Sequence, residues 1–159
     1  MTVTDRTAQI RQYATGAERL KSAIANVPIA AVRWRPSPEH WTVHEIVLHC
    51  ADSEANAHMR LRYLLAEREP QIIGYDQDRW TQALDYHELP IEPALGVITA
   101  VRANTVPVLE RLGALDWEKT GHHTENGRYS VGQWLDTYAP HLDQHAAQIG
   151  RVIAAWQRR

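Results

Sequence analysis

Long segments with apolar residues every three or four positions constrain this chain more than any other feature of its sequence. Such spacing places the apolar side chains along one side of an α-helix. Four segments show it: residues 5–26, 42–67, 92–112 and 130–159. No alternation of apolar and polar residues lasts long enough to predict a sheet. Four helices, two of them joined by long connections, therefore predict an all-α four-helix bundle.

Side chains that favour helix ends mark where these helices begin and end. Thr42 with Glu45, and Ser130 with Gln133, have the spacing of a capping box. They predict that the second helix begins after Thr42 and that the last helix begins after Ser130. Gly113 follows the third periodic segment and is expected to end that helix.

Proline, glycine and asparagine mark the connections between the helices. The segment 70–90 is long for a connection, and its residues 76–84 are predicted to form a short helix. Asn126 and Gly127 form a turn dipeptide that could join a small hairpin. Pro140 lies within the last predicted helix and is expected to kink it, because proline removes one backbone donor.

Length, charge and cysteine content set the class of protein. The chain has 159 residues and is expected to form a single domain over residues 1–159. Its net charge is −2, which predicts no binding of nucleic acid and no binding of a membrane surface. The lone Cys50 cannot form an internal disulfide, and no apolar run is long enough for a membrane span or a signal peptide. These features predict a cytoplasmic protein.

Two histidines on the last predicted helix are the strongest indication of a functional site. His141 and His145 are four residues apart, so their side chains lie close together on one face. That face is the apolar one, because Tyr138, His141, His145 and Ile149 form a single stripe. Paired imidazoles at this spacing commonly bind a divalent metal ion. The alternative is that each histidine is an ordinary hydrogen-bonded residue of the core or the surface.

A third ligand is expected from another helix, since metal sites in helical bundles collect side chains from facing helices. His49 lies one turn after Ile46 on the second predicted helix and is the best candidate. Three neutral imidazoles leave coordination positions for water or substrate, which is the open arrangement of a catalytic site. His49, His141 and His145 are therefore the predicted metal ligands.

Further polar residues lie near these histidines in the sequence. Asp52, three residues after His49, is predicted to orient a ligand or to act as a base. Gln148, three residues after His145, is expected to orient that ligand. His122 and His123 precede the last helix and lie either in a surface loop or at a substrate entrance.

Two sequence runs resemble the signatures of the DinB/YfiT-like family. The first is WTVHEIVLHCAD at residues 41–52, and the second is GRYSVGQWL at residues 127–135, followed by His141, His145 and Gln148. The segment 74–80 also resembles a recurring part of the family. The order and spacing of these runs hold over most of the chain.

The resemblance implies a four-helix bundle with an up-down-down-up order and long crossover connections. It also implies a divalent metal ion held by three histidines, which are His49, His141 and His145 at the matched positions. Nickel or zinc is typical of the family, and iron or manganese are further candidates. Homodimers are common among its members.

The expected function is that of a metal-dependent enzyme acting on a small molecule. Some relatives transfer a low-molecular-weight thiol such as bacillithiol, and others are called hydrolases, so both reaction types are expected. The alternative is a non-catalytic stress or sensor protein that binds a metal ion or a small ligand. A third possibility is a structural bundle whose histidine cluster is incidental. The matched residues specify the metal site and leave the substrate open.

Overall fold

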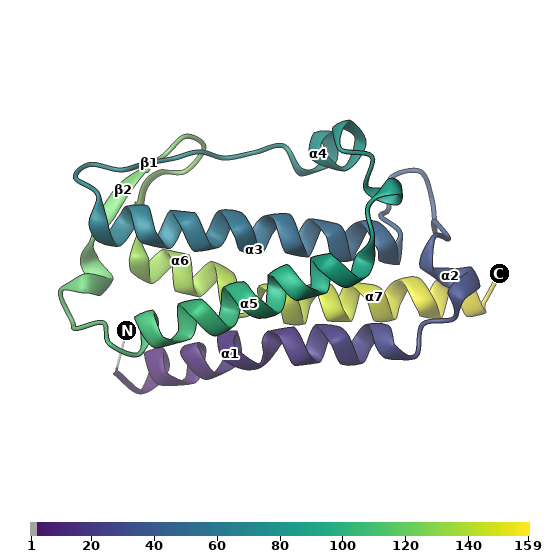
Figure 1. The fold of residues 1–159 in the computed structure, drawn as a ribbon, viewed down its shortest axis with the longest axis horizontal. Coiled ribbons are helices and arrows are strands. Elements are labelled where there is room, and N and C mark those ends of the chain that lie inside the picture. The colour runs from purple at the N-terminus through teal and green to yellow at the C-terminus, as the bar shows by residue number, and fades with distance from the viewer. Residues whose placement is uncertain (1–2) are drawn as a thin grey trace.

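Four rods of helix run along the length of the molecule (Figure 1). They are α1 (Val3–Ala25), α3 (Val43–Ala66), α5 (Ile91–Leu109), and a fourth rod made of α6 (Val131–Tyr138) and α7 (His141–Gln157). The computed structural model describes residues 3–159, with side chains from residue 6 onward. Residues 1 and 2 of the predicted domain lie outside the described residues.

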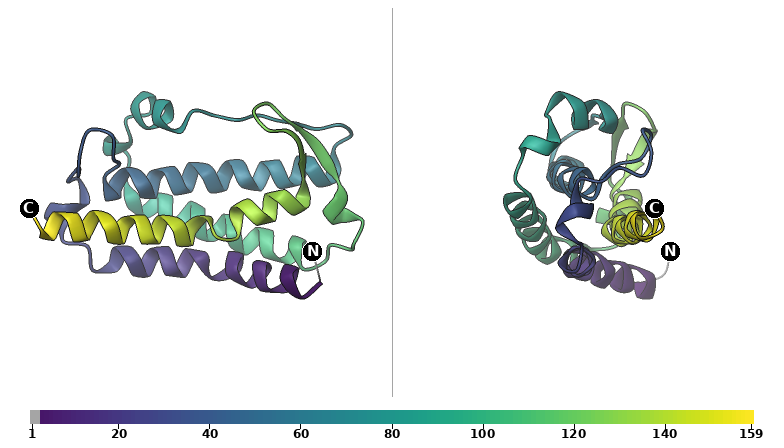
Figure 2. Two further views of the ribbon diagram at one scale, coloured as in Figure 1. Left: turned by 180° about the vertical axis from the view of Figure 1, so that it is seen from behind. Right: turned by 90° about the vertical axis from the view of Figure 1, so that its right-hand side faces the viewer.

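The direction of the rods gives the bundle its order. α1 and the α6–α7 rod run one way and α3 and α5 run the other way, so the order is up-down-down-up (Figure 1). α3 packs against α5, and α1 packs against both α5 and α7, while α6 and α7 also contact α3. The end-on view in Figure 2 shows the rods arranged side by side around the long axis of the bundle. The predicted four-helix bundle with this order is confirmed.

A long connection is required because α3 and α5 are parallel neighbours. Residues 67–90, called the crossover below, return along α3 to the end where α5 begins (Figure 1). The crossover contains β1 (Gln71–Ile72), α4 (Gln77–Ala83) and a 3₁₀ turn at Tyr86–Glu88. The short helix predicted there is confirmed, and Asp76 caps its first turn. The connection from α1 to α3 holds α2 (Ile29–Val32).

The connection from α5 to α6 forms most of a small sheet. It contains a 3₁₀ turn at Asp116–Glu118, β2 (Thr120–His123) and β3 (Gly127–Ser130). β2 pairs antiparallel with β3, and β1 of the crossover pairs parallel with β2. The predicted hairpin is confirmed, and Gly127 adopts a φ of 70°, a left-handed conformation that glycine reaches without strain. The pairing of β1 with this hairpin was not predicted, because strands of two to four residues are too short for an alternation of apolar and polar residues to be recognised in the sequence.

The predicted starts of α3 and α6 are confirmed, and two other predictions about helix boundaries are corrected. Both capping boxes are present, at Thr42 and at Ser130. α5 ends at Leu109, before Gly113, since the chain passes into a turn at residues 110 and 111. Pro140 separates α6 from α7 instead of only kinking one helix, because the proline cannot donate the backbone hydrogen bond that would join them.

A layer of buried polar residues divides the core into two apolar clusters. One cluster includes Ile46 and Val47 near the start of α3, and the other includes Ala57 and Leu61 farther along the same helix. Between them on α3 lie buried polar side chains, among them Ser53 and Glu54. In this layer, charged and titratable side chains are buried away from water. Burial shifts the pKa values of such groups, which is typical of functional sites. None of the helices within residues 3–159 is both long enough and apolar enough to cross a membrane.

Candidate metal centre

Three imidazoles from two helices converge in the polar layer. His49 lies in the first half of α3 and is almost fully buried, and His141 and His145 lie at the start of α7. The ring centroids of His141 and His145 are 4.6 Å apart, and His49 lies 5.7 Å from the first and 4.9 Å from the second. One ring nitrogen from each residue lies within 4.8 Å of the other two. The structure thus brings the three predicted ligands together.

The distances suit a single divalent ion. The Nε2 atoms of His141 and His145 are 3.2 Å apart. Two nitrogens bound to one tetrahedral zinc ion, each at about 2.0–2.1 Å, would be separated by roughly 3.3 Å. The Nδ1 atom of His49 is buried and has no hydrogen-bond partner among the described residues. Buried polar atoms normally have a partner, so this arrangement fits a bound cation.

Neighbouring acceptors indicate which ring nitrogen of His141 and of His145 carries the hydrogen. The Nδ1 atom of His145 lies 2.8 Å from the amide oxygen of Gln148, which can only accept. The Nδ1 atom of His141 makes no hydrogen bond of normal length among the described residues, but it lies 3.6 Å from the carboxylate of Glu54, whose negative charge favours a hydrogen on that nitrogen. We infer that both Nδ1 atoms carry the hydrogen, which leaves both Nε2 lone pairs directed at the centre. Gln148 therefore makes the contact with His145 that the sequence predicts.

Burial keeps two of the imidazoles neutral at physiological pH. Loss of solvent, with a smaller effect of the neighbouring histidines, lowers the pKa of His49 to about 3. Loss of solvent and the nearby His141 lower the pKa of His145 to about 4. Only the neutral imidazole can bind a metal ion, so neither residue has to lose a proton first at pH 7.

A buried ion pair between Glu54 and Arg102 lies next to His141. The carboxylate of Glu54 is fully buried and accepts a hydrogen bond of 2.6 Å from the Nη2 atom of Arg102 on α5. Arg102 also donates to the backbone carbonyls of Tyr13 and Tyr138, which ties α1, α5 and α6 together at this level. Burial alone would raise the pKa of Glu54, but the contact with His141 and the charge of Arg102 outweigh it and hold that pKa below its usual range.

Neither member of this ion pair is among the residues predicted from the sequence. Each occupies a position in an otherwise apolar stripe: Glu54 lies four residues after Cys50, and Arg102 lies four residues after Ile98. A charged residue on the apolar face of a predicted helix is the sequence signal that could have identified both residues.

Asp52, which the sequence predicts to orient a ligand or to act as a base, contacts the crossover. Its carboxylate accepts a hydrogen bond from the hydroxyl of Tyr86 in the crossover. Within residues 3–159, no hydrogen bond or ion pair joins it to the three histidines. The carboxylate that contacts a predicted ligand is that of Glu54, two residues farther along α3. A role for Asp52 as a base stays a prediction.

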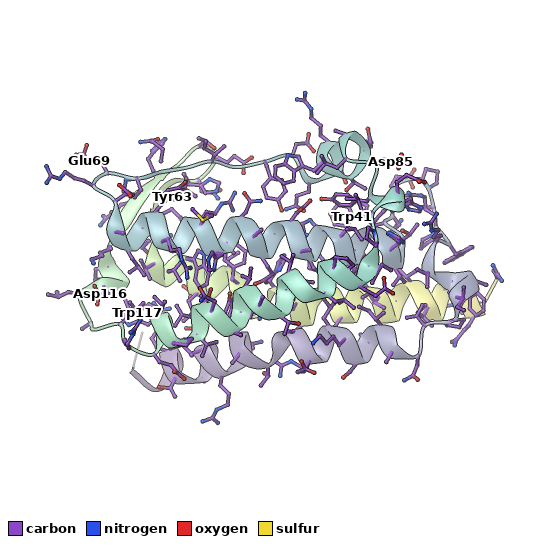
Figure 3. The ribbon with its side chains drawn as sticks, viewed as in Figure 1. Trp41, Tyr63, Glu69, Asp85, Asp116 and Trp117 are labelled. Atoms are coloured by element: carbon purple, nitrogen blue, oxygen red, sulfur yellow. The ribbon has the colours of Figure 1, made fainter. Side chains whose placement is uncertain are left out.

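The crossover is attached to the site through a tryptophan. The indole of Trp41 packs on the ring of His49, with centroids 4.7 Å apart. Its Nε1 atom donates a hydrogen bond of 2.8 Å to Asp78 of α4. Figure 3 shows Trp41 at the end of α3 that lies below α4. One side of the imidazole cluster is therefore covered by an aromatic ring that the crossover holds in place.

A polar cavity of about 190 Å³ borders His141 on another side. The hydroxyl of Ser53, which also lines it, lies 3.4 Å from the Nε2 atom of His141. Of the two adjacent histidines on β2, His123 is buried and lines this cavity, whereas His122 is exposed. The prediction of a surface position therefore holds for His122, and His123 lies where a small molecule could reach the site.

Comparisons with known proteins identify the family of this chain. The model of the DinB superfamily matches residues 12–149. A protein of Oceanobacillus iheyensis named "Putative metal-dependent hydrolase" is 38% identical over 109 residues, which cover 69% of this chain and 63% of the relative. A protein of the same name from Bacillus mycoides is 31% identical over 109 residues, which cover 69% of this chain and 62% of the relative. The match thus spans less than two thirds of the length of these relatives.

A solved structure shares the fold along nearly the whole chain. YfiT from Bacillus subtilis, described as a probable metal-dependent hydrolase with an unusual four-helix bundle topology, superposes with a TM-score of 0.90. The two chains are 20% identical, and the superposition covers 99% of this chain and 90% of YfiT. At this identity, the likeness establishes the shared bundle.

Proposed function

Because this chain belongs to the DinB superfamily, we propose that it is a metal-dependent enzyme whose divalent ion is held by His49, His141 and His145. The observation that carries the proposal is the convergence of three imidazole nitrogens within 4.8 Å, beside a polar cavity. Nickel and zinc are the proposed ions, and iron and manganese are further candidates, since imidazole ligands alone do not select among them.

Each residue around the ion has a separate task. The bound ion would supply Lewis-acid chemistry, which polarises a carbonyl oxygen and lowers the pKa of a nucleophile. Gln148 and Glu54 hold the His145 and His141 rings in the orientation that presents their Nε2 atoms. Trp41 shields one face of His49 from water. The cavity beside His141 receives the small-molecule substrate.

The names of the relatives support hydrolysis, in which water is the nucleophile. Transfer of a low-molecular-weight thiol is the second reaction that an open site of this kind supports, because the same ion would activate a thiol. The two reactions differ only in the nucleophile that enters the site, so assays with both kinds of substrate separate them.

Metal binding is tested first, on protein purified without a histidine tag. Elemental analysis is expected to find close to one divalent ion per chain. His141→Ala is expected to weaken the affinity for that ion by at least tenfold, because it removes one of three ligands. His122→Ala, which removes an exposed histidine outside the cluster, is the matched control and is expected to keep the ion. Full metal content in His141→Ala would contradict the ligand assignment.

Activity is tested on the same preparations. Small esters and amides probe hydrolysis, and bacillithiol, mycothiol and glutathione with an electrophile probe thiol transfer. Activity that disappears on chelation, returns with the ion and is lost in His141→Ala would support an enzyme. Inactivity of the metal-loaded protein against both panels would contradict it and would favour the non-catalytic metal-binding alternative.

A further inference from the structure

The cavity beside His141 has a wall built mainly from hydrogen-bond donors. It lies where α3, α6, the crossover and the β2–β3 hairpin meet. Its volume of about 190 Å³ corresponds to about six water molecules of liquid, so it suits a group of a few heavy atoms. The side chains that the argument uses are Ser53, Arg60, Tyr75, His123 and Tyr138.

Two of these side chains carry buried donors without a partner. The Nε atom of Arg60 and the hydroxyl of Tyr75 are both inaccessible to solvent, and neither makes a hydrogen bond of normal length among the described residues. The hydroxyl of Ser53, which also lines the cavity, is the polar side chain that interacts with Tyr75 at longer range. Buried donors are nearly always satisfied in folded proteins. Two unsatisfied donors on one cavity therefore indicate that a ligand with acceptor atoms belongs there.

The charge of Arg60 is not neutralised by the protein. Its Nη1 atom donates to the hydroxyl of Tyr138 at 2.9 Å, and its Nη2 atom donates to the backbone carbonyl of Ile73. Both partners are uncharged, and among the side chains described, which are those of residues 6–159, no carboxylate forms an ion pair with Arg60. A half-buried guanidinium without a counter-ion favours an anionic ligand.

His123 adds a third donor. Its Nδ1 atom accepts a hydrogen bond of 3.2 Å from the backbone N–H of Glu125, so in the neutral ring the hydrogen lies on Nε2. The carboxylate of Glu125 also borders the cavity, but Glu125 is an exposed residue of the hairpin turn, and its side chain lies close against Gly74. The negative charge is therefore at the rim, whereas the buried donors lie farther inside.

We propose that this cavity binds a small carboxylate group of the substrate, with Arg60 as its charge partner and with Tyr75 and His123 as additional donors. The inference rests on the proposed function, because His141 lines the cavity and is also one of the three proposed metal ligands. A carboxylate held here would place the rest of the substrate toward the ion. The substrates of the enzyme are accordingly small carboxylic acids or their derivatives.

The test compares propionate with its neutral analogue propionamide, titrated calorimetrically into metal-free and metal-loaded protein. Propionate is expected to bind both forms, and propionamide is expected to bind at least tenfold more weakly. Arg60→Met should weaken propionate binding at least tenfold, and Arg60→Lys, which keeps the charge, should recover part of the loss. Arg62→Met is the matched control, because Arg62 lies two residues along the same helix and bonds to His58 and Asn104, which do not line the cavity.

The outcomes separate this inference from the proposed function. Equal binding of propionate and propionamide, or propionate binding that survives Arg60→Met, would overturn the carboxylate site. Propionate binding only by the metal-loaded protein would place the anion on the ion and would also overturn it. Metal content is measured on every variant, so a failure of metal binding by the wild type contradicts the proposed function alone. Circular dichroism of Arg60→Met checks that the variant folds.

Discussion

Glu54 and Arg102 show how single residues hold the centre in place. Both side chains are almost completely removed from water, and their charges lie 2.6 Å apart. Taking two ions out of water is costly, so such a pair adds little net stability, yet the loss of one partner leaves the other unpaired. Because the same carboxylate contacts His141, the pair links the packing of α5 to the orientation of a proposed ligand.

Glu54→Gln is expected to lower the free energy of unfolding by about 3 kcal/mol, since it leaves the buried guanidinium of Arg102 without a counter-charge. The affinity for the divalent ion is expected to fall by about tenfold or more, because His141 loses the carboxylate that orients it. Urea unfolding of the metal-free protein and a competition titration with a chelator measure the two effects.

The control for this change is Glu18→Gln, which alters an exposed glutamate paired with Lys21 on the surface of α1. It is expected to change the free energy of unfolding by no more than about 0.5 kcal/mol. If Glu54→Gln kept the metal affinity of the wild type and the free energy of unfolding of the control, Glu54 would not be the residue that positions His141.

At the scale of elements, the fourth rod depends on how its two helices begin. α6 has only eight residues, and its start is closed by a capping box. The Ser130 hydroxyl accepts from the backbone N–H of Gln133 at 3.1 Å, and the Gln133 side chain accepts from the N–H of Ser130 at 2.8 Å. α7 then begins at His141, directly after Pro140, so a well-ordered α6 determines where the two histidines of α7 lie.

Ser130→Ala is expected to lower the free energy of unfolding by about 1 kcal/mol, because one of the free N–H groups of α6 loses its acceptor. Ser22→Ala is the matched control. Ser22 is exposed inside α1 and only donates back to the carbonyl of Glu18, so alanine is expected to leave the stability unchanged or to raise it slightly. Equal stability of the two variants in urea would mean that the cap at Ser130 does not stabilise α6.

At the scale of the whole molecule, the parallel packing of α3 and α5 determines what covers the centre. The chain must return along the bundle between these helices, and the crossover does so above α3 (Figure 1). Two of its residues form hydrogen bonds with the site: Asp78 accepts one from Trp41, and Tyr86 donates one to Asp52. A third residue, Tyr75, lines the cavity. The connection that the topology requires is therefore also a wall of the site.

The stability of the metal-free protein is expected to fall as the pH is lowered from 7 toward 5. The pKa values of His49 and His145 in the folded chain, about 3 and about 4, lie below the usual value of about 6.5. The unfolded chain therefore binds protons in this window that the folded chain does not bind. The stabilisation is complete above about pH 6.5 and is lost as the pH falls, by roughly 2 kcal/mol for each histidine at pH 5.

Thermal and urea unfolding between pH 5 and pH 7.5, with a chelator present, measure this dependence. His145→Gln is expected to remove about half of the slope that His49 and His145 contribute together, because one of these two groups is gone. Burial also lowers the pKa values of His58 and His123, so a smaller slope from those residues stays. His122→Gln, which changes an exposed histidine, is expected to keep the slope of the wild type. The same slope in all three proteins would show that the buried imidazoles do not account for it.

Local signals in the sequence were sufficient for the helices and for part of the site. The periodicity of the apolar residues predicted the four rods, and the caps at Thr42 and Ser130 predicted two helix starts to the residue. The stripe shared by His141 and His145 predicted their common inward face, because residues four apart on a helix are neighbours whatever surrounds them. These features depend on side chains that are close in sequence.

Only the tertiary structure decided which distant groups meet. It brought His49 to the pair on α7, placed Glu54 rather than Asp52 against His141, and paired Glu54 with Arg102 of another helix. It also aligned β1 with β2 and closed the cavity around Arg60. No local pattern encodes these contacts, because each depends on the packing of segments far apart in the chain. The sequence by itself therefore determined the helices, the inward histidine pair and the choice of His49 as a candidate third ligand. The packing of the bundle decided that His49 meets the pair, that Glu54 and Arg102 lie beside His141, and which side chains form the cavity.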